Sequence, residues 1–155
     1  MPLSKHLSFF CKTSRAWCDN GDFLVDRHIN WSLVVIFMVR RFQDILLWQK
    51  SYSFANRAYD VSLSFPKEEV YALTSQFRRA ALSIPLNVAE GCGRETRKDF
   101  VRFLYIAVGS LRECQCVLLF AKDRSYLSVS DFERLYADLD ALAGMFHRFI
   151  ENVRY

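Results

Sequence analysis

From Met38 to the C-terminus, apolar residues return every three or four positions, which is the spacing of one face of a helix. The most regular run keeps a heptad spacing and consists of Phe132, Leu135, Leu139, Leu142, Phe146, Phe149 and Val153. No segment shows the alternation of apolar and polar residues that is typical of a half-buried strand. The pattern therefore predicts an all-α protein.

Three further runs with the same spacing precede this one. The first predicts a helix over about 43–64, with the apolar face Ile45, Trp48, Tyr52, Ala55 and Tyr59. The second predicts a helix over about 69–90, with the face Leu73, Phe77, Ala80, Ile84, Val88 and Gly91. The third has the face Phe100, Phe103, Ala107, Ser110 or Leu111, Cys114, Leu118 and Ala121.

Residues typical of helix ends separate the four runs. Pro66 ends the first helix, because proline cannot continue the hydrogen-bonded turn. Thr96 and Asp99 have the spacing of a capping box at the start of the third helix, and Ser130 and Glu133 have it at the start of the fourth. Helices joined by short connections are antiparallel neighbours, so we predict an antiparallel up-down four-helix bundle.

Pro85 lies inside the second helix and allows two interpretations. In one, Ser83 or Ile84 caps a new helix with Pro85 in its first turn. In the other, the helix continues through a kink, although a proline in a helix interior costs about 3 kcal/mol. The apolar face keeps its phase across the proline, from Phe77 to Val88, and this favours a continuous helix.

A polar stripe runs beside the apolar face of the second helix: Gln76, Arg79, Ser83, Asn87, Glu90 and Arg94. A solvated surface explains such a stripe in most helices. Ser83 and Asn87 are poor helix formers, however, and a packed polar interface with another helix or subunit gives a reason for them. The candidate oligomer interface is Gln76, Arg79, Ser83, Asn87 and Glu90, and a solvated surface is the alternative.

Two glycines and a cluster of basic residues follow. Gly91 and Gly93 predict the end of the second helix, because glycine adopts the left-handed C-cap conformation without steric cost. The start of the third helix is a possible phosphate site, since its free N–H groups and dipole favour anions. The candidate nucleic-acid-binding residues are Arg78, Arg79, Arg94, Arg97, Lys98 and Arg102. A C-cap followed by a solvated basic turn is the alternative.

The composition fits one globular domain in a reducing compartment. The chain has 155 residues, 52% of them hydrophobic, and a net charge of +4 that permits an anionic partner without requiring one. The five cysteines form no Cys-x-x-Cys pair, so we expect a cytoplasmic protein without a disulfide framework or zinc site.

Residues 1–37 differ from the rest, because no periodicity holds there. Their apolar run, with Met38 and Val39, is nine residues long, and about 20 are needed to span a bilayer. The run ends in Arg40 and Arg41 instead of the small residues of a signal cleavage site. We expect residues 1–37 to be a poorly ordered or non-native extension, residues 38–155 to form the bundle, and no membrane association.

No combination of residues predicts catalysis. Beyond residue 37, His147 is the only histidine, and Gly144 stands where the Glu-x-x-His motif of di-iron bundles needs a glutamate. Glu90 and Glu113 are the one candidate pair of carboxylates, and solvated or hydrogen-bonded carboxylates are far commoner. We therefore expect no enzyme activity, no catalytic residue, no metal and no cofactor.

Three stretches resemble a known family: "FQDILLWQKSYSFA", "FPKEEVYALTSQFRRAALSIPLNVAEGCGR" and "RKDFVRFLYIAVGSLREC". They are similar to the bacterial four-helix-bundle family of 23S rRNA intervening-sequence proteins, from about Phe42 to Leu127. The chain also resembles the accessory variability determinant of diversity-generating retroelements, a basic bundle that binds nucleic acid and a reverse transcriptase. The resemblance implies a cytosolic bundle that assembles as a pentamer, and it brings no catalytic residues.

Two functions are consistent with these observations. The first is a homo-oligomeric accessory protein that binds RNA or DNA through its basic residues, with the choice between the two nucleic acids open. The alternative is a structural or adaptor oligomer that binds a partner protein and does not contact nucleic acid.

Overall fold

The computed structural model describes residues 41–154, which form four α-helices. These are α3 (Leu46–Val61), α4 (Ser75–Cys92), α5 (Arg97–Asp123) and α6 (Val129–Arg154). Short 3₁₀ segments flank α3, namely η1 (Phe42–Asp44), η2 (Ser62–Ser64) and η3 (Lys67–Glu69), and a π-helical turn, η4 (Val70–Thr74), leads into α4. Over this range no strand forms, which confirms the all-α prediction. The expectation for residues 1–37 lies outside the described residues.

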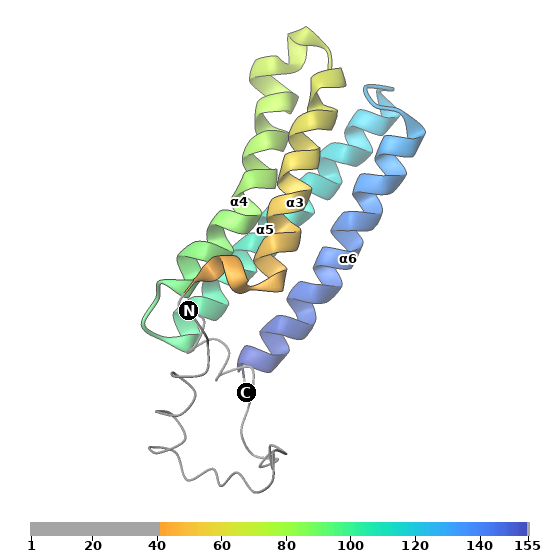
Figure 1. The fold of residues 1–155 in the computed structure, drawn as a ribbon. Coiled ribbons are helices and arrows are strands. Elements are labelled where there is room, and N and C mark those ends of the chain that lie inside the picture. The colour runs from red at the N-terminus through yellow and green to blue at the C-terminus, as the bar shows by residue number, and fades with distance from the viewer. Residues whose placement is uncertain (1–40, 155) are drawn as a thin grey trace, which may run out of the picture.

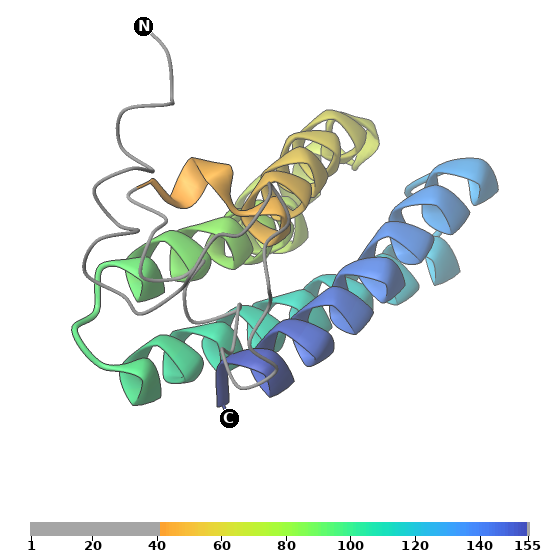
Figure 2. The ribbon, with the colours of Figure 1, turned by 60° about the horizontal axis from the view of Figure 1, so that its bottom comes forward.

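The four helices pack in a ring in which each contacts its neighbours in sequence and α3 also contacts α6. The α4–α5 connection lies at one end of the bundle, and the α3–α4 and α5–α6 connections lie at the other (Figure 1). The second view shows the same alternation of direction, with α5 and α6 side by side (Figure 2). The antiparallel up-down four-helix bundle is therefore confirmed.

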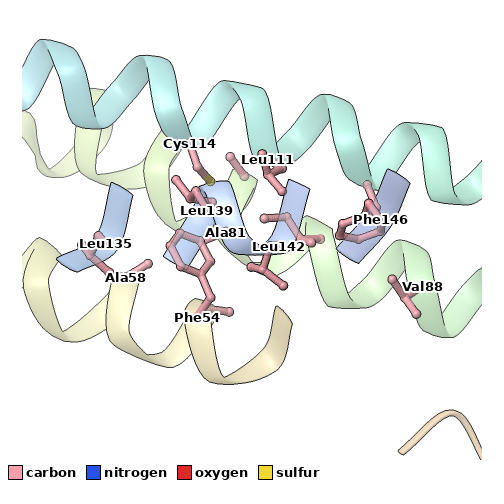
Figure 3. Close-up of a cluster of buried hydrophobic side chains, with 14 of the residues drawn as sticks. Phe54, Ala58, Ala81, Val88, Leu111, Cys114, Leu135, Leu139, Leu142 and Phe146 are labelled. Atoms are coloured by element: carbon pink, nitrogen blue, oxygen red, sulfur yellow. The ribbon is translucent and has the colours of Figure 1, made fainter. Parts of the chain in front are cut away.

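The apolar faces of all four helices meet along the axis of the bundle. Phe54, Ala81, Leu111 and Leu139 come from α3, α4, α5 and α6 respectively, and all are buried (Figure 3). Burying a Phe or Leu side chain stabilises the folded state by roughly 1.5–3 kcal/mol. The shared core is the main contribution that holds the helices together.

The predicted apolar face of the first helix is partly wrong. Tyr52 is 47% exposed and Tyr59 is also exposed, whereas Leu47 and Phe54 are buried. The buried face includes Ser51, whose hydroxyl donates a hydrogen bond to the carbonyl of Leu47 at 2.8 Å. This bond satisfies the hydroxyl inside the core, and so a serine occupies a position where the hydrophobic pattern indicates an apolar residue.

The continuous second helix is confirmed. α4 runs unbroken through Pro85, which is itself fully buried, and the alternative of a new helix capped at Ser83 or Ile84 is wrong. The start of this helix differs from the prediction, because residues 67–74 form a 3₁₀ segment and a π-helical turn. The Glu69 carboxylate caps this turn by accepting a hydrogen bond from the N–H of Leu73 at 3.3 Å.

The starts of the last two helices are capped by side chains. Thr96 accepts a hydrogen bond from the N–H of Asp99 at 3.1 Å, as the capping-box spacing predicted. The predicted cap of the fourth helix at Ser130 is wrong. Ser128 accepts from the N–H of Asp131 at 3.1 Å, and α6 begins at Val129. Two Ser-x-x-acid pairs overlap here, and the earlier one closes the first turn.

Candidate nucleic-acid interface

The turn between α4 and α5 depends on two glycines with different roles. A Cβ at Gly91 would lie 2.7 Å from the ring of Phe100 and 3.1 Å from the Cβ of Phe103. Gly91 therefore belongs to α4 and permits the close approach of α5. Gly93 is the C-cap, with φ −85° and ψ 1°, so the predicted left-handed C-cap is wrong. Together they bring the basic start of α5 against the end of α4.

Four of the six predicted basic residues lie at this end of the bundle. Arg94 pairs with Glu90, and its guanidinium lies 4.4 Å from the centre of the Phe103 ring. Arg97, Lys98 and Arg102 are exposed, and their side chains make no hydrogen bond or ion pair within residues 41–154. These three charges are available to an external anion.

The other two basic residues lie elsewhere. Arg78 donates a hydrogen bond to the Ser62 hydroxyl at 2.7 Å, and its guanidinium lies 5.2 Å from the centre of the Tyr59 ring. Arg79 donates to Gln76 at 2.5 Å. With a rise of 1.5 Å per residue, Arg78 lies about 24 Å from Arg94 along the helix axis. The structure therefore does not bring Arg78 and Arg79 together with the other four.

The start of α5 is already partly neutralised. The hydroxyl of Thr96 accepts a hydrogen bond from the N–H of Asp99, so this N–H is not free for an anion. The Asp99 carboxylate lies in the first turn of the helix, where the helix dipole stabilises a negative charge. An anion at this helix end competes with that carboxylate. The phosphate site predicted at this helix end stays a prediction. The exposed basic side chains can contact a phosphate without competing with the Asp99 carboxylate for the helix end.

The polar stripe of α4 packs largely against α5 of the same chain. The hydroxyls of Ser83 and Ser110 are 2.8 Å apart, and Gln76 donates a hydrogen bond to Glu113. Asn87 donates to the carbonyl of Ser83 at 2.8 Å and to its hydroxyl at 2.9 Å. The helix that explains these small polar residues is thus α5, and the subunit interface predicted from the stripe stays a prediction.

Two exposed leucines on α4 were missed by the sequence analysis. Leu86 is 57% exposed and Leu82 is partly exposed one turn before it, near the exposed members of the stripe, Arg79 and Glu90. Their spacing of four was a usable signal for a second apolar strip on the helix. Together, Arg79, Leu82, Leu86 and Glu90 define the outer face of α4.

A second exposed stripe follows α5. Its members are spaced four and three residues apart and all are exposed; we call them the outer face of α5: Lys98, Arg102, Tyr105, Gly109, Arg112 and Cys116. Sequence analysis used Lys98 and Arg102 for their charge and missed the rest, because the stronger apolar pattern of the buried face hides a second stripe on the same helix.

In the described part of the chain, two of the three cysteines are shielded from solvent to different degrees, and no metal site forms. Burial raises the pKa of the Cys92 thiol to about 11 and raises the pKa of Cys114 further. Cys116 is exposed. Among residues 41–154, no three His, Cys, Asp or Glu side chains gather as a metal site would require. The expectations of no enzyme activity and no cofactor stay predictions.

α5 is long and apolar enough to cross a membrane by length and composition. The core helix of a bundle satisfies the same test, and α5 packs against both α4 and α6. This property is therefore weak evidence for a membrane, and the expectation of no membrane association stays a prediction.

The fold and this surface define a class of protein: an up-down four-helix bundle with a basic end at its α4–α5 turn. Residues 43–148 match the family model of the 23S rRNA-intervening sequence proteins, and the chain belongs to that family. It is also similar to the crystal structure of a protein with unknown function from the S23 ribosomal protein family of Bacteroides thetaiotaomicron VPI-5482. The TM-score is 0.64 at 22% identity, over 68% of this chain and 98% of that one. Among curated proteins, none matches.

Proposed function

We propose that the protein is a non-enzymatic, homo-oligomeric accessory protein of the cytoplasm that binds nucleic acid through the basic end of its bundle. The observation that carries the proposal is a set of three exposed cations at the start of α5, Arg97, Lys98 and Arg102, which have no ion-pair partner among residues 41–154. Family membership supports it, because the resemblance implies pentameric bundles and a nucleic-acid-binding relative. A ring of identical subunits multiplies a weak basic patch through avidity.

A salt titration tests the proposal. Binding to phosphates releases counterions, so affinity for RNA, single-stranded DNA or duplex DNA falls steeply as salt rises. We expect the triple substitution Arg97→Ala, Lys98→Ala and Arg102→Ala to weaken binding and to flatten the slope of log affinity against log salt. Fluorescence anisotropy with a labelled oligonucleotide measures both.

The control is a second triple variant with the same loss of charge at the opposite end of the bundle. Lys67, Lys122 and Arg124 are exposed and lie in or beside the α3–α4 and α5–α6 connections. Their replacement by alanine leaves affinity and slope unchanged if the basic end binds. Equal losses in both variants, or no binding at about 50 mM salt, where phosphate contacts are strong, contradict the proposal.

The alternative is an adaptor oligomer that binds a partner protein, and the exposed Leu82 and Leu86 on α4 favour it. An adaptor stays oligomeric and shows no affinity for nucleic acid at any salt concentration. The same titration, run beside a measurement of molecular mass, therefore separates the two functions.

A further inference from the structure

Beyond the basic end, the outer face of α5 combines cations with an aromatic ring. Lys98, Arg102 and Arg112 are exposed on it, and one N–H of the Arg112 guanidinium donates a hydrogen bond to Gln115 at 2.7 Å, which leaves its other N–H groups to contact an anion. Tyr105 between them is 52% exposed and stacks on no other aromatic ring in the described residues. At 1.5 Å per residue, the stretch from Lys98 to Arg112 is about 21 Å long. This face is therefore a narrow track of positive charge with one uncovered ring.

Within α5 itself, little negative charge opposes this track. The carboxylates within α5 are Asp99, Glu113 and Asp123. Asp99 belongs to the capping interaction, Glu113 accepts a hydrogen bond from Gln76 of α4, and Asp123 is the last residue of the helix. From α6, Asp140 accepts a hydrogen bond from Gln115 at 2.8 Å, beside Arg112. The outer face of α5 itself carries cations and no carboxylate between Lys98 and Arg112, which suits a polyanion.

Gly109, one turn after Tyr105, leaves the surface of α5 open at that position. A helical side chain leans toward the N-terminus and covers the turn before its own Cα, so the residue at i+4 normally covers the one at i. The residue at i+4 from Tyr105 is Gly109, and a Cβ built there meets no atom within 4 Å. There is therefore room for a planar group over the bare backbone at Gly109, one turn along the helix from Tyr105.

We propose that a single strand of nucleic acid lies along the outer face of α5, with one base stacked on Tyr105 and its phosphates contacting Lys98, Arg102 and Arg112. This inference rests on the proposed function and names its ligand class. Exposed aromatic rings between cations are how sequence-tolerant proteins bind single strands. A duplex fits less well, because its bases are already stacked, and because α4 and α6 flank α5 and prevent it from entering a groove as a lone helix.

The test compares substitutions at Tyr105 in the full chain. We expect Tyr105→Ala to weaken binding of an oligouridylate or oligothymidylate of about 20 nucleotides by about 5- to 150-fold, which corresponds to one lost stacked base. Tyr105→Phe keeps the ring and retains the affinity. Tyr71→Ala is the control, since Tyr71 is 96% exposed in η4, at the other end of the bundle, and its loss leaves affinity unchanged.

A second variant probes the open space at Gly109 without removing the Tyr105 ring. Gly109→Leu places a side chain where the structure has open space, so the fold tolerates it, and it fills the space that the proposed site leaves to a base. We expect it to weaken single-strand binding as Tyr105→Ala does. Neither variant changes the binding of a duplex of the same length.

The outcomes separate this inference from the proposed function. If the wild-type chain binds neither single strands nor duplex, both fail. If it binds with a steep salt dependence but Tyr105→Ala and Gly109→Leu keep full affinity, or if duplex binds as tightly as single strands, the proposed function stands and the stacking site is wrong. The uridylate and thymidylate arms show whether the site distinguishes RNA from DNA.

Discussion

Gly91 shows how one residue fixes the distance between two helices. Its missing Cβ is the reason that Phe100 and Phe103 of α5 lie against the end of α4. The sequence predicts a turn that needs glycine here, but the cause at Gly91 is close packing and not a left-handed C-cap. A glycine near a predicted helix end is consistent with a C-cap and with close packing, and only the position of the neighbouring helix distinguishes the two.

The two glycines of this turn make a matched pair for mutation. Gly91→Ala forces a methyl group against an aromatic ring in the core, and such overpacking costs about 1–3 kcal/mol of stability. Gly93→Ala places the methyl group 3.4 Å from the Glu90 carbonyl at an ordinary backbone conformation, so we expect little change. Chemical denaturation followed by circular dichroism measures both, and equal stabilities would contradict the packing role of Gly91.

The presence of the four helices follows directly from the sequence. Their buried faces and their exact ends are harder to predict. The spacing predicts three of the four apolar faces correctly, because apolar residues hold most of their buried positions. The face of α3 is the exception, because Ser51 occupies the core and two exposed tyrosines continue an apolar spacing on the surface. Which face of α3 is buried depends on how the neighbouring helices pack against it. The spacing of apolar residues within one helix does not contain that information.

The start of α6 gives a prediction at the level of the helix. Ser128 accepts a hydrogen bond from the N–H of Asp131, so Ser128→Ala removes the cap and costs about 1 kcal/mol. The Ser130 hydroxyl lies 3.0 Å from that of Ser128, but Ser130→Ala keeps the capping bond to the N–H of Asp131 and costs less than about 0.5 kcal/mol. Thermal or denaturant unfolding of the two variants distinguishes them. A larger loss of stability for Ser130→Ala than for Ser128→Ala would instead support the cap at Ser130.

At the level of the whole molecule, the bundle followed from the sequence because its connections are short. Short connections make consecutive helices antiparallel neighbours, and four of them close into a ring. The candidate site was less predictable. Arg78 and Arg79 lie near the start of α4, at the end of this helix that is far from the basic turn. The contacts of Arg78 with Ser62 and Tyr59 become visible only when α3 and α4 are packed together.

The outer face of α4 gives the prediction for assembly. If the proposed oligomer uses Leu82 and Leu86, then Leu86→Asp introduces a charge into the interface and lowers the molecular mass measured by light scattering. The subunit stays folded, because Leu86 is 57% exposed. Leu63→Asp is the control, since Leu63 is 77% exposed in η2, in the α3–α4 connection and away from the outer face of α4. A wild-type monomer, or an oligomer that Leu86→Asp leaves intact, contradicts this interface.

The outer face of α5 also carries its own chemical handle. The thiolate is the reactive form of cysteine, and burial keeps Cys92 and Cys114 protonated at neutral pH, whereas Cys116 is exposed. In a chain with Cys11 and Cys18 replaced by serine, a maleimide dye therefore attaches at Cys116. The dye sits about 16 Å along the helix from Tyr105. A change in its fluorescence reports the binding of a ligand to the outer face of α5, and no cysteine has to be introduced.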